Sequence, residues 1–293
     1  MRRAAAIFVC ALLNAFGQTN DPITVPAKLH HGRIILTARI AESGPFTFLL
    51  DSACTISTLH PELVDVLKLN PSGRVRINGI AGEERAPTYT GVVFDLGGAT
   101  YSPRRVASVP SERNERRRRD GVLDAGFFRR FVVELMPDSE SLRLYASTNF
   151  NYNGNGTIVP FRFKEEIPVV KGALVTGDKE FTDAEFEIDT GCDSGLCLGE
   201  NFVKSHNLLE KIEGRSSEKF GVGGSVETKI GHVPALRIGE AEIKNVQTDF
   251  FLKGSPVDDP LAGHIGMGVL GKRKVIFDYA RKRLIIEEQA RSK

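Results

Sequence analysis

The sequence has no tryptophan, only four cysteines, and a formal net charge of only +2 over 293 residues. A balance this even provides no surface-wide field to attract nucleic acid or an anionic membrane, so we expect neither as a partner. The hydrophobic fraction is 41% and the charged fraction is 26%, close to the averages of soluble globular proteins. These values exclude wholesale disorder, collagen and polytopic membrane proteins, and the length suits two domains or one large one.

The N-terminal apolar run is too short to span a bilayer, which requires about 20 residues. It extends from Ala4 to Leu13, after the basic residues Arg2 and Arg3 and before the small residues Ala15 and Gly17. This is the pattern of a secretory signal peptide, with an uncleaved anchor as the alternative. We therefore expect a signal peptide at 1–17, export to the periplasm or the medium, and no other association with a membrane.

Beyond the predicted signal peptide there are only three cysteines: Cys54, Cys192 and Cys197. A chain of this length can build its core without disulfides, so small buried side chains are the default interpretation, and one pairing among the three stays open. Their spacing fits no zinc pattern and the six histidines are scattered, so we expect neither a metal nor a cofactor. No histidine is matched to Cys54 or Cys192, so no nucleophilic role is indicated.

The two halves of the sequence repeat one order of elements. In each half, two apolar or alternating runs joined by a polar turn predict a pair of strands, and the second strand ends at an aspartate. The strands are predicted at 33–40 and 46–50 before Asp51, and at 167–174 and 184–188 before Asp189. The two aspartates are therefore 138 residues apart (189 − 51).

Three further features follow each aspartate in the same order: a short helical pattern, a glycine-rich hairpin tip, and an apolar-glycine segment leading into two more strands. They lie at 60–69, 78–82 and 121–128 in the first half, and at 200–209, 221–224 and 263–270 in the second. The last pair of segments is offset by 142 residues (263 − 121), close to the offset of the aspartates. We therefore interpret the chain as an internal duplication.

A stretch rich in asparagine and glycine, residues 149–157, separates the two halves as a linker does. The predicted organisation is a signal peptide at 1–17, an N-terminal lobe at 18–148, the linker at 149–157 and a C-terminal lobe at 158–293. Within the first half, four arginines run from Arg116 to Arg119. An anion-binding arm and a processing site are alternatives for this run, but the balanced overall charge favours a solvated surface loop.

An aspartate at a strand end has a chemical use when two copies face each other. Two carboxylates about 3 Å apart cannot both ionise, so they share one proton. The ionised carboxylate can take a proton from water, while the protonated one hydrogen-bonds the carbonyl group that the water attacks. Hydrolysis by this route requires neither a metal nor a protein nucleophile, and it favours acid to mildly acid pH.

At Phe48-Leu-Leu-Asp51-Ser-Ala and Phe186-Glu-Ile-Asp189-Thr-Gly, the sequence resembles the pepsin/retropepsin clan of aspartic proteases. It is most similar to bacterial exported proteins that carry two retropepsin-like units in one chain, and the resemblance covers roughly residues 33–286. It implies an all-β fold with few short helices: a two-lobed acid-protease fold of tandem retropepsin-like β-barrel lobes with the active-site cleft between them.

The resemblance also implies a function, that of an aspartic endopeptidase in which Asp51 and Asp189 are the catalytic pair. The substrate would be an extended peptide or protein, bound partly by backbone pairing. Because one chain already holds both units, we expect a monomer. Pairing of each half with a half of another chain is the alternative.

The same resemblance assigns roles to the neighbours of the pair. Ser52, Thr190 and Gly191 would brace the aspartate loops, and glycine-rich flaps would close over the bound peptide. The flap glycines are Gly79, Gly82, Gly223 and Gly224, and the groove residues are Cys54, Cys192 and Asp193. For Asp193, capping of the following turn is the alternative to binding a basic side chain of the substrate.

Departures from the family pattern leave a second function open. The first loop has Ala53 where the family has glycine, and Asp124 replaces the glycine of the apolar-apolar-Gly element, with Gly126 where an aspartate is common. In the second half, His264 stands at an apolar position. A methyl group can forbid conformations and close approaches that glycine tolerates. The alternative is therefore a catalytically weak or inactive peptide- or protein-binding module on the same fold.

Overall fold

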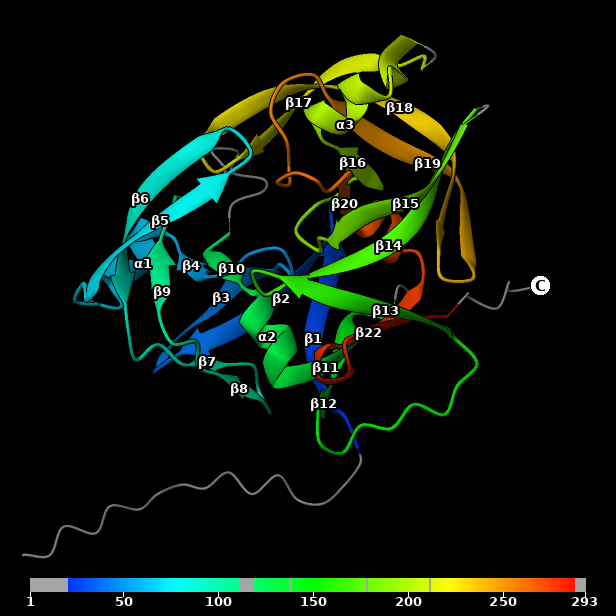
Figure 1. The fold of residues 1–293 in the computed structure, drawn as a ribbon. Coiled ribbons are helices and arrows are strands. Elements are labelled where there is room, and N and C mark those ends of the chain that lie inside the picture. Colours follow the sequence, from blue (N-terminus) through cyan, green and yellow to red (C-terminus); the bar gives the residue numbers. More distant parts are fainter. Residues whose placement is uncertain (1–20, 111–118, 137–138, 178, 211, 288–293) are drawn as a thin grey trace, which may run out of the picture.

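The computed structural model describes residues 21–110, 119–136, 139–177, 179–210 and 212–287 (Figure 1). The predicted signal peptide and the arginines at 116–118 lie outside this part of the chain. Within it, the structure consists of 22 strands and four short α-helices, as the all-β prediction requires. No helix in the described ranges has the length and apolar character needed to cross a membrane.

A six-stranded antiparallel sheet contains strands from both halves of the chain. Its strands, in spatial order, are β1 (Ile23–His30), β12 (Ser141–Ala146), β11 (Phe131–Leu135), β21 (Lys274–Asp278), β22 (Arg283–Glu287) and β13 (Thr157–Lys164). At its centre, Val133 of β11 lies opposite Phe277 of β21, and both side chains are fully buried. Burial of these apolar side chains on pairing stabilises the joint between the halves.

The N-terminal half adds its own sheet and two helices. The elements are β2 (Arg33–Ile40), β3 (Ser43–Leu50), β4 (Ser57–Leu59), α1 (Pro61–Val66), β5 (Gly73–Gly79), β6 (Gly82–Tyr89), β7 (Phe94–Asp95), β8 (Thr100–Tyr101), β9 (Val106–Ser108), β10 (Gly121–Leu123) and α2 (Ala125–Arg130). In β2, every second side chain from Ile34 to Ile40 is buried, which is the period-2 pattern of a strand with one face on a core.

The C-terminal half repeats this arrangement. Its elements are β14 (Ile167–Thr176), β15 (Lys179–Ile188), β16 (Leu196–Leu198), α3 (Glu200–Ser205), the 3₁₀ turn η2 (Leu208–Glu210), β17 (Arg215–Gly221), β18 (Gly224–Ile238), β19 (Ala241–Phe251), β20 (Gly263–Ile265), α4 (Met267–Leu270) and the 3₁₀ turn η3 (Tyr279–Arg281). The strand β13 gives its first half to the shared sheet and its second half to this lobe, as β1 does in the N-terminal half.

The repeat found in the sequence has a structural counterpart around the aspartates. The strand before each aspartate pairs in parallel with the apolar-glycine strand: Phe48 of β3 lies opposite Gly121, and Phe186 of β15 lies opposite Gly263. In both halves, this pairing brings a loop that begins with an aspartate to the middle of the molecule. Residues 147–156, between β12 and β13, contain no helix or strand. The exact lobe boundaries stay a prediction.

Candidate active site

The two aspartate loops, which follow β3 and β15, are locked together by reciprocal hydrogen bonds. The Ser52 N–H donates to Thr190 Oγ1 and the Thr190 N–H donates to Ser52 Oγ, each at 3.0 Å. Each hydroxyl then donates to a backbone carbonyl in the opposite half of the molecule, Ser52 to that of Ile188 at 2.6 Å and Thr190 to that of Leu50 at 2.8 Å. Ser52 and Thr190 are fully buried, so these bonds have no competing water.

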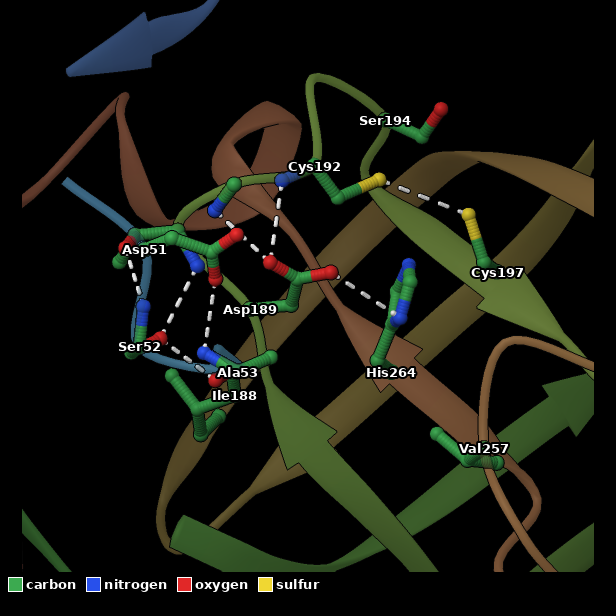
Figure 2. A network of polar contacts seen from close by, with 12 residues as sticks. Asp51, Ser52, Ala53, Ile188, Asp189, Cys192, Ser194, Cys197, Val257 and His264 are labelled. Carbon is green, nitrogen blue, oxygen red and sulfur yellow. Dashed lines mark hydrogen bonds and ion pairs between the residues drawn. The ribbon is translucent and has the colours of Figure 1, made fainter. Parts of the chain in front are cut away.

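The loops present the two predicted catalytic carboxylates to each other (Figure 2). The N–H of Ala53 donates to Asp51 Oδ1 at 2.8 Å. The N–H groups of Gly191 and Cys192 donate to Asp189 Oδ1 at 2.7 and 3.1 Å. One oxygen of each carboxylate is thus held by its own loop, which fixes the direction of the other oxygen.

The environment of the pair favours one shared negative charge. Burial raises the pKa of Asp51 to about 7, with a further increase from the neighbouring Asp189 carboxylate. Burial also raises the pKa of Asp189, but the nearby His264 opposes this shift. The two carboxyl groups therefore titrate as a pair, and Asp51 keeps its proton to near-neutral pH.

His264 is a member of this site whose contact with the pair sequence reasoning missed. Strand β20 places its Nδ1 3.2 Å from Asp189 Oδ2, and only 8% of its side chain is exposed. Burial disfavours the charged imidazole, but the Cys192 sulfur and the Asp189 carboxylate raise the pKa of His264 to about 9. The only signal in the sequence was a polar residue where an apolar one was expected.

The three cysteines lie in different surroundings, and all of them are free thiols. The Cys54 thiol donates to the Ile56 carbonyl at 3.0 Å, and burial raises its pKa. The Cys192 sulfur lies 3.6 Å from that of Cys197, and the hydrogen bond with Cys197 and the adjacent His264 lower the pKa of Cys192. The expectation that no histidine is matched to Cys192 is therefore wrong: His264 lies beside it in the fold, although the two residues are far apart in the sequence.

The carboxylate of Asp193 is engaged by cations of the chain itself. It lies 3.6 Å from Arg33 Nη2 and 3.3 Å from Lys219 Nζ. The same lysine nitrogen lies 3.1 Å from Oδ2 of Asp249, which is fully buried. Asp193 is thus part of an ion-pair cluster beside the second aspartate loop.

The residue at the glycine position of the first apolar-glycine element, Asp124, caps helix α2. Its carboxylate accepts hydrogen bonds from the N–H of Ser57 at 2.9 Å, the N–H of Gly126 at 3.1 Å and the hydroxyl of Tyr101 at 2.5 Å. Its backbone is extended, with φ of −87°. In the second half, a Cβ on Gly266 would lie 2.4 Å from a backbone carbonyl. Glycine is therefore required by close packing in only one of the two elements.

The same contrast holds for the aspartate loops. A Cβ on Gly191 would lie 2.3 Å from Asp51 Oδ2, so this loop has no room for alanine. Ala53, at the matching place in the first loop, has an ordinary negative φ and donates its N–H to Asp51. The methyl group of Ala53 therefore imposes no left-handed backbone strain on the site.

The predicted flap glycines lie at two hairpin tips, β5–β6 and β17–β18, which meet each other (Figure 1). The N–H of Ala81 donates to the Val222 carbonyl at 3.3 Å. A Cβ on Gly79 would lie 2.4 Å from Val222, and one on Gly223 would lie 2.5 Å from the nitrogen of Gly82. Both tips therefore need glycine for their contact.

Comparisons with known proteins agree with this geometry. Residues 36–126 match the family model described as aspartyl protease. No curated protein matches the chain. Among the solved structures, the aspartic proteinase from Irpex lacteus superposes with a TM-score of 0.60 at 14% identity, over 92% of this chain and 98% of that one. This likeness shows a two-lobed, pepsin-like fold, and the family model shows that residues 36–126 are similar to an aspartyl protease.

Proposed function

We propose that the protein is an active aspartic endopeptidase that uses Asp51 and Asp189 as its catalytic pair. The observation that carries this proposal is the buried lock between Ser52 and Thr190, which holds the two carboxylates face to face. A scaffold that only binds peptides has no need to keep two partly buried carboxyl groups side by side, because desolvating them costs free energy.

In the proposed reaction, a water molecule lies between the two carboxyl groups. Asp189, in its ionised form, takes a proton from this water while the oxygen attacks the peptide carbonyl carbon. Asp51 donates its proton to the carbonyl oxygen, which gives a tetrahedral diol. Asp189 then passes its proton to the amide nitrogen while Asp51 takes a proton from a hydroxyl of the diol. The carbon–nitrogen bond breaks to give a carboxylic acid and an amine, and the pair again holds one proton, on Asp51.

The proposed substrate is an extended stretch of polypeptide that lies between the pair and the two hairpin tips. Hairpin edges can pair with the backbone of such a segment, and side-chain pockets then supply selectivity. Phe220, next to the tip of β17, is 66% exposed, which favours an apolar side chain in the bound peptide. Glycines at the tips allow the opening that entry and release require.

We also propose that the protein is exported and acts as a monomer. The pattern at 1–17 supports export, and the presence of both aspartates in one chain supports a monomer. Sedimentation of the mature chain tests the second point: an active species with the mass of one chain is expected, and activity confined to a dimer would contradict it.

A cleavage assay with matched variants tests the catalytic proposal. The folded, reduced mature chain is incubated with a diverse peptide library between pH 4 and 8, and products are identified by mass spectrometry. Asp51→Asn and Asp189→Asn are each expected to lower kcat/KM by about 10³-fold, within the range of general acid–base catalysis. Asp65→Asn, an exposed aspartate on α1, is the control and should keep full activity.

The same samples distinguish the alternative function. Peptide binding is measured by fluorescence anisotropy in parallel with cleavage. Wild-type protein that binds peptides but cleaves none over this pH range would replace the enzyme with the binding module. Cleavage that survives both asparagine variants would show that other residues carry the reaction.

A further inference from the structure

Three side chains with metal-binding atoms gather beside the aspartate pair, and the proposed peptidase reaction uses none of these atoms. They are Cys192, Cys197 and His264, and their donor atoms all lie within 4.8 Å of one another. Figure 2 shows the two sulfurs and the imidazole ring converging on the side of Asp189 that faces away from Asp51. Cys197 and His264 are buried, and Cys192 is partly exposed.

The separation of the two sulfurs fits a shared metal ion. Zinc–thiolate bonds of about 2.3 Å in tetrahedral geometry place two sulfurs about 3.8 Å apart. The Cys192 and Cys197 sulfurs lie 3.6 Å apart. A disulfide requires about 2.05 Å, so the present arrangement is close to that of two ligands of one ion rather than of a bonded pair.

The imidazole provides an independent indication. His264 Nδ1 faces Asp189 Oδ2 at 3.2 Å, which leaves Nε2 as the nitrogen available to a ligand. That nitrogen is buried and makes no hydrogen bond within the described part of the chain. A histidine that binds a metal through one nitrogen commonly donates its other N–H to a carboxylate, which fixes the ring.

We propose that Cys192, Cys197 and His264 form a site for one zinc ion, oriented by the contact between His264 and Asp189. Two thiolates neutralise the charge of Zn²⁺, and a set of two cysteines and one histidine leaves the fourth tetrahedral position open to water. Lys219, whose charge acts on both cysteines, is paired with Asp193 and Asp249, so these carboxylates offset its charge. The proposal does not depend on peptidase activity.

The equivalent positions of the N-terminal half lack most of the metal-binding side chains. In the C-terminal half, His264 of β20 lies opposite Cys197 of β16. The corresponding strands β10 and β4 place Val122 opposite Thr58. Only Cys54 matches a ligand, namely Cys192, so this half retains one of the three donors and provides a natural set of control positions.

Cobalt(II) is the probe for the first experiment, because thiolate ligands give it an intense charge-transfer absorption in the near ultraviolet. The mature chain is reduced with a phosphine, freed of metal by a chelator and titrated with Co²⁺. We expect saturation at one equivalent with a thiolate-to-cobalt band, followed by loss of that band when one equivalent of Zn²⁺ is added. Reduced wild-type protein that shows no such band would overturn the proposal without any variant.

Variants then assign the ligands. Cys192→Ser, Cys197→Ser and His264→Val should each weaken Zn²⁺ binding by at least about 100-fold, the upper range seen when only an outer-shell partner is lost. Cys54→Ser should bind as wild type does. Unchanged affinity in either Cys192→Ser or Cys197→Ser, or a loss equal to theirs in Cys54→Ser, would contradict the assignment.

Two controls keep this test separate from folding and from catalysis. Circular dichroism and urea unfolding of each metal-free variant identify any variant that fails to fold. If a variant fails to fold, the cobalt spectrum of the wild-type protein decides the proposal. Asp51→Asn should retain the cobalt band, because Asp51 is not one of the proposed ligands and the carboxylate that orients His264 is that of Asp189. Failure of the peptidase assay would leave these spectra unaffected.

Discussion

The two halves of the molecule build the same backbone around their aspartates and surround them with different chemistry. In the N-terminal half, the element beneath the loop carries the apolar Val122 and a hydrogen-bonded Asp124. In the C-terminal half, the same element carries His264 against Asp189, and Gly266 packed against a carbonyl. The strand registers that position the loops match in both halves. Duplication preserved the geometry of the pair, while its electrostatic environment diverged.

This difference gives the two carboxyl groups unequal roles before any substrate arrives. His264 lies 3.2 Å from Asp189 and opposes the rise in the pKa of that carboxyl group, whereas the loop of Asp51 supplies its carboxylate with a single backbone N–H. The third loop positions also differ, because a Cβ on Gly191 would lie 2.3 Å from the Asp51 carboxylate whereas Ala53 carries a methyl group at the matching place. The positions are therefore equivalent in sequence but not in energy.

Among the substitutions that test this comparison between the halves, the largest effect is expected from Gly191→Ala in the tighter loop. Gly191→Ala would place a methyl group 2.3 Å from Asp51 Oδ2, so the carboxylate has to move. Displacement of a catalytic group by about 1 Å costs on the order of 10²-fold, and we expect kcat/KM to fall by about that factor. Steady-state kinetics measures it, and activity within a few-fold of wild type would show that the loop relaxes freely.

The pH profile measures the inequality of the two aspartates directly. Because burial and Asp189 raise the pKa of Asp51 to about 7, kcat/KM should fall about tenfold per pH unit above that value as Asp51 loses its proton. The Ala53 N–H, Arg119 and His264 act in the opposite direction and are included in that value. A profile that declines from pH 4 to 5 would show that Asp51 is not the group that must stay protonated.

Stability should follow the same titration. A raised pKa in the folded state means that folding favours protonated Asp51. Its contribution to stability is therefore fully present below the ordinary value of 3.8 and is lost as the pH rises through about 7. The free energy of unfolding of wild type and of Asp51→Asn can be measured with urea at pH 4 and pH 8. It should decrease less between these two pH values in the variant than in the wild type.

Removal of either half of the lock should cost about the same, because the halves contribute equivalent bonds. Ser52→Ala and Thr190→Ala each leave a buried N–H and a buried carbonyl unsatisfied, so each should lower the free energy of unfolding by about 3 kcal/mol. Urea denaturation of both variants and of the double mutant measures their coupling. Ser216→Ala, an exposed serine on β17, is the control and should unfold as wild type does. A large difference between the two alanine variants would refute the equivalence.

Restoring the family pattern beneath the first loop should harm the protein. Asp124→Gly removes the acceptor of three hydrogen bonds and the cap of α2, so we expect a loss of about 2 kcal/mol of stability and no gain in kcat/KM. Thermal unfolding and the cleavage assay report the two quantities. A gain in activity would indicate that the aspartate marks decay of the first half.

The smallest effect should come from Ala53→Gly, the mirror image of the first substitution. The alanine backbone has no left-handed strain to relieve, so the change mainly adds freedom to the unfolded chain and lowers stability by less than about 1 kcal/mol. kcat/KM should stay unchanged. An increase comparable with the loss in Gly191→Ala would mean that the alanine restrains the active site.

Much of the fold was predictable because it rests on local patterns that occur twice. The apolar run at 33–40, followed by a polar turn, predicts a strand with the bounds that β2 has, and the helical pattern at 60–69 contains α1. The aspartate loops and hairpin tips were located by their repeated order. The repeat could not show which departures from the family pattern are accommodated by the rest of the structure. Asp124 is one of them: it accepts a hydrogen bond from the hydroxyl of Tyr101, which lies on a separate strand.

The surroundings of Asp189 were not predictable for a physical reason. Cys197 and His264 meet because two short strands pair in one register, and a shift by one residue would turn either side chain to the other face. Sequence spacing contains no information on that register. The same holds for the hairpin tips, whose contact depends on how the two lobes sit on the shared sheet.

The shared sheet also sets the order in which the strands can pair while the chain is being synthesised. During synthesis, β12 can pair with β1 on one edge and with β11 on the other once the first half has emerged. The other edge of β11 has no partner until β21, near the end of the chain, is made. Until then, the nascent N-terminal half presents the unpaired edge of β11, next to apolar side chains that are buried in the complete fold. An exposed apolar strand edge of this kind tends to pair with a neighbouring chain. Export in an unfolded state would avoid this exposure by delivering both halves to the same compartment before either one folds.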